Sequence, residues 1–478
     1  GAMHVDENNH YMTLTSCTYI RNRALSTGGS LHFGRNNENI TLDRGTFSDN
    51  VAGTDGGGVF LNLQNHDMTF ISCNFTGNRA HEGGGISVHS DNSGVALAFC
   101  SFTHNTATNG GSFFARNSNA NMSLTSCVML GNSASGDGGG VYLSEDNIGM
   151  KLTSCDFIQN TAEATSNAGG LYVGYANNFL SLYKCDFFQN TATRNGGGLF
   201  LFSQNLYATL ALCNFTENAV ILGGGGGVFL DSNNHNAMFT SCTFEGNTAP
   251  IGGGILVSSA HHYMTLSSCT FSANAASHYG GAVNVFANNE DMSIEYSRFI
   301  GNTAFDGGAL YLNKDNIIMS ISFCAFDQNT AINDGGAVFV NNANTRLSIV
   351  SCTFNTNLAS NGGGICVHSV NNYLFISSSN FTKNVVASYG GGFYVSGDND
   401  FMVVISCVFL ENTAHLHGGG MGVGNNNWDM ELKRLSFVGN TADKDGGALG
   451  LFFDNFRMTV SDSMFHNNSA RNAGEFFV

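Results

Sequence analysis

Two aspartates have the residue type and spacing that a reaction on a polysaccharide would require. Asp156 and Asp186 hold equivalent positions in two consecutive copies of a sequence repeat, and Lys184 lies close to the second. Glycoside hydrolysis uses two carboxyl groups that flank the scissile bond, so this pair is the main catalytic candidate. A catalytic cleft also needs walls, yet the repeats around the pair are uniform and carry no long insertion. We therefore expect no enzyme and assign no catalytic residue, with a polysaccharide lyase or hydrolase as the alternative.

Cysteines are the other residues that invite a chemical interpretation, and the sequence contains 13 of them. Twelve fall in one column of the repeat, and Cys366 alone lies in a different, outward-facing column. A linear stack of thiols does not converge on a tetrahedral metal. Parallel side chains at a spacing of about 4.8 Å are also too far apart for an ordinary disulfide. We expect reduced, buried thiols with Cys366 the most reactive, and no metal site or cofactor; some disulfides or a metal are the alternatives.

The repeat covers almost the whole chain. Its anchor is the cysteine column, which recurs 17 times at a spacing of about 28 residues. The residue two places later is Phe in 15 of the 17 copies, and three places further on Asn occurs in every copy. A second Asn column lies eight residues before the anchor, interrupted only by His261, and a glycine pair follows the first Asn column. Such self-similarity is typical of a solenoid, in which each repeat packs against its neighbours.

Alternating apolar residues in each repeat indicate short strands, as in Val59-Phe60-Leu61 and Cys73-Asn74-Phe75. A period of two places one face of each strand inside the protein. Three short strands and their bends in about 28 residues make one coil of a parallel β-helix, and parallel crossovers are usually right-handed. We therefore predict an all-β, right-handed parallel β-helix of about 17 coils with buried Phe and Asn ladders.

The middle residue of the first strand in each coil should point outward, and it is aromatic or large and apolar in six consecutive coils. Aromatic residues anchor interfaces, and soluble proteins rarely leave a contiguous apolar patch uncovered. We expect an exposed stripe that binds a partner, although stacking between neighbouring strands also favours aromatic residues. The candidate binding residues are Phe114, Tyr142, Tyr172, Phe200, Phe229 and Leu256.

The composition restricts the partners and the domain organisation. Asp and Glu number 35 against 18 Lys and Arg, which opposes the basic surface that nucleic acids require. No apolar stretch approaches the roughly 20 residues of a transmembrane helix. Gly1-Ala2-Met3 is typical of a cloning remnant, so we separate residues 1–4 from a single β-helix over residues 5–478. No capping element is visible at either end, up to Val478, so we expect a segment of a longer rod, or end-to-end self-association.

The columns resemble the repeats of the chlamydial polymorphic membrane proteins, whose signature is Phe-x-x-Asn followed by Gly-Gly-Ala and Ile, Leu or Val. The sequence contains Phe271-x-x-Asn274 before Gly280-Gly281-Ala282-Val283, and the same pattern recurs from Phe299. Many other copies carry Gly-Gly-Gly in place of Gly-Gly-Ala. The resemblance implies a β-helix like the passenger of an autotransporter, which works as an adhesin at the cell surface.

From this resemblance we expect an extracellular or cell-surface protein that acts by adhesion or recognition. Its partner would be a receptor or glycan on a host or neighbouring cell. A rigid spacer or a filament-forming unit is the structural alternative.

Overall fold

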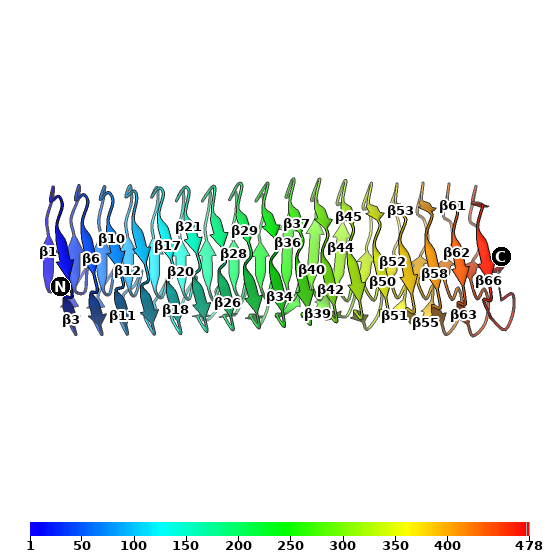
Figure 1. Ribbon diagram of the computed structural model, residues 1–478, viewed down its shortest axis with the longest axis horizontal. Helices are drawn as coiled ribbons and strands as arrows, with labels where there is room; N and C mark the ends of the chain where they lie inside the picture. The colour runs from blue at the N-terminus through cyan, green and yellow to red at the C-terminus, as the bar shows by residue number, and fades with distance from the viewer. Residues whose placement is uncertain (475, 478) are drawn as a thin grey trace. The chain divides into compact units, whose positions relative to one another are not determined.

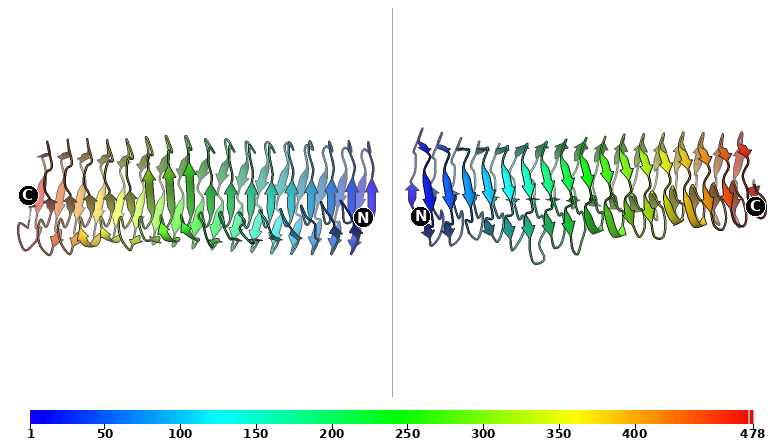
Figure 2. Two further views of the ribbon diagram at one scale, coloured as in Figure 1. Left: turned by 180° about the vertical axis from the view of Figure 1, so that it is seen from behind. Right: turned by 60° about the horizontal axis from the view of Figure 1, so that its bottom comes forward.

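The computed structural model describes residues 1–474 and 476–477, so Val478, the predicted final strand position, lies outside the described residues. The chain divides into a first unit, Gly1–Thr243, and a second unit, Phe244–Val478. In each unit, equivalent strands of successive coils lie side by side, as seen from the front in Figure 1 and from behind in Figure 2. The described residues form no helix, so none of them lies in a helical segment suited to crossing a bilayer.

Each coil contributes three main strands, and one coil of the first unit shows the pattern. It contains β9 (Val59–Leu61), β10 (Thr69–Ile71) and β11 (Asn74–Thr76). Every strand pairs in parallel with its counterpart in the next coil, as β11 does with β14 (Ser101–Thr103). A further short strand, such as β8 (Val51–Ala52), precedes the glycine corner in most coils. The predicted fold, an all-β parallel β-helix with three main strands per coil, is confirmed.

The first strands of the coils form a parallel sheet in each unit. In the first unit they are β1 (Met3–Val5), β5 (Leu31–Phe33), β9, β12 (Ile86–Val88), β16 (Phe113–Ala115), β20 (Val141–Leu143), β24 (Leu171–Val173), β28 (Leu199–Leu201) and β32 (Val228–Leu230). In the second unit they are β36 (Ile255–Ser259), β40 (Val283–Ala287), β44 (Leu310–Lys314), β48 (Val338–Val340), β52 (Ile365–Val367), β56 (Phe393–Val395), β60 (Met421–Val423), β64 (Leu449–Leu451) and β67 (Phe476–Phe477).

Ladders of identical side chains fill the interior of each unit. The backbone N–H and the side-chain Nδ2 of Asn50 both donate to Oδ1 of Asn78 in the next coil, at 3.0 and 2.9 Å. Nδ2 of Asn50 also donates to the carbonyl of Tyr19 in the preceding coil, at 3.0 Å. The rings of Phe47 and Phe75 stack with centroids 4.6 Å apart. Buried polar groups must be hydrogen-bonded, and the Asn ladder meets this requirement at the bends.

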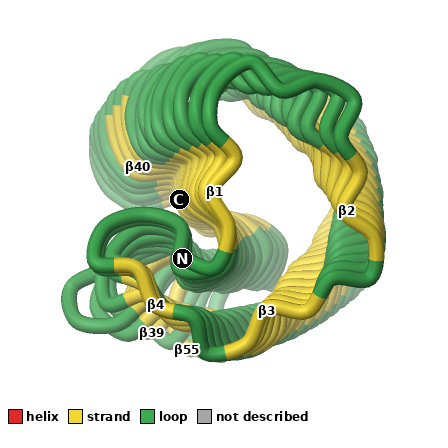
Figure 3. Tube along the Cα trace, turned by 90° about the vertical axis from the view of Figure 1, so that its left-hand side faces the viewer, coloured by secondary structure: helices red, strands yellow, loops and turns green. Residues whose placement is uncertain are grey.

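In each unit a strip on the outer face of the first-strand sheet carries the pockets and cross-coil side-chain contacts described below, and we call this strip the groove. Figure 3 shows how the chain after β4 (Arg23–Ala24) curls into a lobe beside β1 on the outside of the coil. We define the groove by three positions in each coil. Its floor is the middle residue of the first strand, one wall is the residue five places earlier, and the other wall is the residue two places later. At the glycine corner, Gly56 has a φ of 66°, a conformation that glycine adopts without strain.

Candidate functional site

The predicted binding stripe lies on the floor of the groove, in register but largely buried. In the first unit its rings stack from coil to coil, with centroids between 4.5 and 5.3 Å apart. Phe200 is 3% exposed and only Tyr142 is half-buried. In the second unit Leu256 is also buried. The residues of this stripe are Phe114, Tyr142, Tyr172, Phe200, Phe229 and Leu256.

The expectation that this stripe is exposed is therefore wrong. An interior ring of the stack, such as Tyr172, has both faces against its neighbours, Tyr142 and Phe200. An outward direction therefore does not bring exposure at these positions. Stacking between neighbouring strands, the other interpretation of these aromatic residues, agrees with the geometry.

In the second unit the groove floor is not continuously aromatic, and a pocket lies beside Tyr394. Gly422 and Gly450 hold the floor position in two consecutive coils, after Tyr394. A Cβ atom on Gly422 would lie 3.2 Å from Cδ2 of Tyr394, so the Gly422 backbone already approaches that ring closely. The pocket beside Tyr394 has a volume of about 430 Å³, which is in the range of small-molecule sites.

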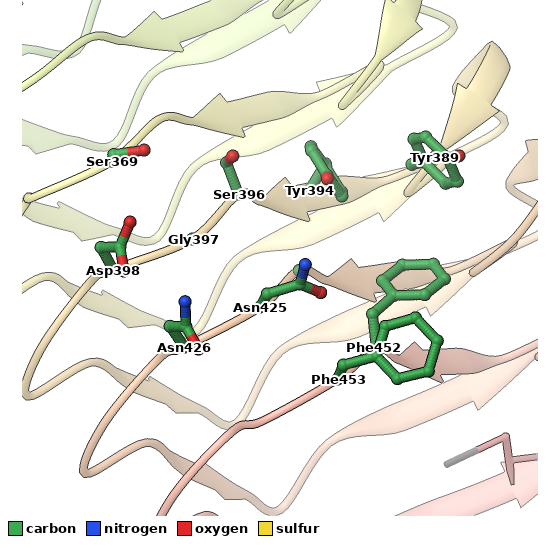
Figure 4. A pocket seen from close by; sticks show the side chains of 11 residues that line it. Ser369, Tyr389, Tyr394, Ser396, Gly397, Asp398, Asn425, Asn426, Phe452 and Phe453 are labelled. Carbon is green, nitrogen blue, oxygen red and sulfur yellow. The ribbon is translucent and has the colours of Figure 1, made fainter.

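The pocket combines aromatic rings with amide and hydroxyl groups. Tyr389 and Tyr394 stack at 5.6 Å, and Phe452 meets Tyr389 edge to face at 5.4 Å. Burial raises the pKa of Tyr394 to about 12, so its hydroxyl stays protonated at neutral pH. Figure 4 shows the rings on one side and the smaller polar side chains on the other. The lining residues are Ser369, Tyr389, Tyr394, Ser396, Gly397, Asp398, Gly424, Asn425, Asn426, Phe452 and Phe453.

A charged cluster occupies the groove of the first unit. Asp55 and Glu82 share one wall in consecutive coils, and Nη2 of Arg116 lies 2.5 Å from Glu82 and 3.9 Å from Asp55. Burial, followed by a hydrogen bond to Glu82, raises the pKa of Asp55 to about 6. Burial also lowers the pKa of His89 on the other wall, assisted by the charge of Arg116. Glu82 and Arg116 line a pocket of about 280 Å³ with Tyr142.

The carboxylate pair singled out from the sequence lies elsewhere. Asp156 on β22 (Asp156–Ile158) is in register with Asp186 on β26 (Asp186–Phe188). Burial and then the charge of Asp186 raise the pKa of Asp156. Asp186 is exposed and accepts a hydrogen bond of 2.7 Å from Nδ2 of Asn214. The two residues are thus adjacent as expected, but they line neither of the pockets described above.

Known proteins resemble this chain in its fold. Residues 134–284 match a family model described as a right-handed β-helix region. This match supports a right-handed β-helix repeat, whereas it does not show the specific resemblance to chlamydial polymorphic membrane proteins. No curated protein matches the sequence.

Three solved structures illustrate the similarity. Tailspike protein 3 of bacteriophage CBA120 is 9% identical with a TM-score of 0.35, covering 95% of this chain and 56% of that protein. The A-module of the mannuronan C-5 epimerase AlgE6 from Azotobacter vinelandii is 12% identical with a TM-score of 0.34. The match covers 86% of this chain and 90% of that module. A PL6 alginate lyase in complex with a trisaccharide is 7% identical with a TM-score of 0.22. The match covers 97% of this chain and 83% of that lyase. The chain therefore spans just over half of the tailspike.

These structures correct the expectation that the chain is not an enzyme. Two of the three are an epimerase and a lyase, so inferring a lack of enzymatic activity from the regular coils was wrong. Identities and TM-scores this low show no more than the fold, and they assign neither activity to this chain.

Proposed function

We propose that the protein recognises a glycan along its groove and that the pocket beside Tyr394 holds one sugar unit. The lining of the pocket carries this proposal, because the rings of Tyr389, Tyr394 and Phe452 lie beside amide and hydroxyl groups. A sugar ring presents apolar C–H groups on its faces and hydroxyls at its edge, so its recognition needs both kinds of group. The amides of Asn425 and Asn426 donate and accept hydrogen bonds.

The charge of the protein favours a neutral or amino-bearing glycan. Asp398 lines the pocket, and the formal net charge of the chain is −17. Like charges weaken association, so we expect acidic polysaccharides to bind less tightly. Presented outside the cell, such a groove serves adhesion to a receptor or glycan of a host or neighbouring cell. That location and those partners are part of the proposal.

Binding of oligosaccharides to the full chain tests this function. Titration calorimetry with neutral, amino-bearing and acidic oligosaccharides should identify a ligand. Tyr394→Ala and Asn425→Ala should weaken its binding by about tenfold or more, the size expected for a central contact. Tyr373→Ala is the matched control, because this exposed tyrosine lies outside the pocket. The proposal fails if no oligosaccharide binds, or if Tyr394→Ala binds as tightly as the parent chain.

A second candidate function, cleavage of a polysaccharide, is favoured by the cluster at Asp55. A carboxyl group that is half-protonated near pH 6, beside a second carboxylate, is suited to general acid–base catalysis. Arg116 and His89 place further polar groups at the same place. We expect any product formed from a panel of polysaccharides to be lost in Glu82→Gln and retained in Asp186→Asn. Equal activity in both variants would exclude this cluster.

A further inference from the structure

Three side chains of kinds that bind metal ions converge in the groove of the second unit. Asp334 stands on one wall, Cys366 lies on the floor of the next coil, and His368 stands on the other wall of that coil. One ligand atom from each residue lies within 4.8 Å of the other two. Nε2 of His368 is 3.1 Å from Oδ2 of Asp334, so the two walls meet across the floor.

Cys366 differs from the cysteines of the interior column. Cys352 in that column donates to the carbonyls of Ile321 and Val350, at 3.6 and 3.4 Å. Cys366 is 0% exposed and packs beside Phe339, and no described residue accepts a hydrogen bond from its thiol. Its outward direction therefore does not expose it, and the expectation that it is the most reactive thiol loses its basis. A buried thiol without an acceptor, facing a carboxylate and an imidazole, indicates a place for a ligand.

Neighbouring groups hold the other two side chains in position. Nδ2 of Asn361 donates to Oδ1 of Asp334 at 2.7 Å, which leaves Oδ2 directed at His368. The backbone N–H of Asp334 donates to Oδ1 of Asp306 at 3.1 Å. The ring of Phe339 meets the His368 ring edge to face at 4.6 Å. Such outer contacts orient metal ligands and tune their affinity, and the side chain of His368, 40% exposed, lies at the solvent side of the site.

We propose that Asp334, Cys366 and His368 form a binding site for a divalent transition metal ion of the zinc type. Thiolate and imidazole ligands select Zn²⁺ and Co²⁺, whereas Ca²⁺ and Mg²⁺ prefer oxygen ligands alone. Three protein ligands leave a fourth tetrahedral position for water or for a ligand in the groove. When the ion binds, a metal–sulfur bond forms and the thiol proton passes to solvent, so uptake of the ion releases a proton.

This site departs from the expectation that the protein binds no metal. That expectation was based on the interior cysteine column, whose thiols cannot converge on one ion. Cys366 belongs to the groove floor, where it pairs with Tyr394 of the next coil. The metal site adjoins the proposed sugar pocket, which Ser369, the residue after His368, helps to line. The argument for the metal site does not depend on glycan binding.

Metal binding to the full chain, stripped with a chelator and reduced, tests the proposal with Zn²⁺ and Co²⁺ alone. We expect one ion per chain in competition with a chromophoric chelator, and a thiolate-to-cobalt charge-transfer absorption with Co²⁺. Cys366→Ser and His368→Gln should each weaken binding by about tenfold or more, and Cys366→Ser should abolish the charge-transfer absorption. Ser87 occupies the floor position of another coil, so serine is tolerated there.

Cys407→Ser is the matched control. It removes a buried thiol from the interior column, where Ser379 occurs naturally one coil earlier, and it should bind both ions as the parent chain does. Release of a proton on Zn²⁺ binding to the parent chain provides a measurement that needs no variant. Absence of a stoichiometric ion, equal affinity in folded Cys366→Ser, or bound Co²⁺ without thiolate absorption would each overturn the proposal.

Discussion

Tyr394 and Gly422 hold the same position in neighbouring coils, and the glycine places no side chain against the Tyr394 ring. In the first unit, by contrast, Tyr172 lies between the rings of Tyr142 and Phe200. The ring of Tyr394 therefore has no aromatic floor neighbour in the next coil, and it lines the pocket instead.

Restoring a ring at this position should close the pocket. In Gly422→Phe the new ring would stack on Tyr394, so we expect loss of oligosaccharide binding in calorimetry while the circular dichroism spectrum is retained. The Cβ atom would lie 3.2 Å from the Gly390 nitrogen, which requires a small local shift. Ser87→Phe, which adds a ring to the floor of the first unit, is the control and should bind normally. Unchanged binding by folded Gly422→Phe would argue against this pocket as the sugar site.

The buried stripe should contribute to stability. Truncating a buried Phe typically costs about 3–5 kcal/mol, and we expect Phe200→Ala to lower the free energy of unfolding by that amount in denaturant titrations. Phe188→Ala is the comparison, because Phe188 is 36% exposed and its truncation should cost much less. If Phe200→Ala is as stable as Phe188→Ala, the ring is not packed as described.

The Asn ladder should be sensitive to a single substitution. Asn302 accepts from Asn274, donates to Oδ1 of Asn329 and donates to the carbonyl of Phe271, all at about 3.0 Å. Asn302→Ala leaves buried groups without partners, so we expect a loss of about 1–3 kcal/mol in unfolding free energy. Asn380 on β54 (Asn380–Thr382) is exposed, and Asn380→Ala should change stability little. Equal effects of the two substitutions would contradict the role given to the ladder.

The carboxyl pair Asp55 and Glu82 in the first unit predicts a pH dependence of stability. The folded chain raises the pKa of Asp55 from 3.8 to about 6, so it retains a proton that the unfolded chain releases between these values. The stabilisation that this proton provides is complete below about pH 4 and is lost as the pH rises to about 6. Glu82→Gln removes the neighbouring carboxylate but not the burial, so thermal unfolding should depend less on pH over this interval. Identical pH profiles for the parent and Glu82→Gln would refute the pairing.

Thiol accessibility distinguishes one cysteine from the others. Cys17 is half-buried, whereas the other 12 cysteines are buried. Titration of the native protein with a thiol reagent should modify about one group rapidly, Cys17→Ser should remove that reaction, and denaturation should release the remainder. Rapid native labelling of Cys366 would contradict its burial in the groove.

The repeat columns determined the fold from the sequence alone. In a stacked coil the neighbours of each residue are copies of itself, so the requirements of packing and hydrogen bonding appear as constant columns. Asn50 and Asn78 illustrate this, because each amide needs the same residue one coil away. The Phe column, the glycine corner and the number of coils followed from the same regularity.

Tertiary structure alone decided the groove. Its floor and walls come from separate positions of the repeat, and contacts across it join different coils, as between Asp334 and His368. An aspartate before the glycine pair was visible in the sequence at Asp55 and Asp334, but its partners were not. Alternation within a strand shows which side chains point inward and which point outward. It does not show whether neighbouring side chains cover the outward face. For that reason the sequence alone placed Phe200 and Cys366 on the outside, whereas packing against side chains of neighbouring coils leaves both of them buried.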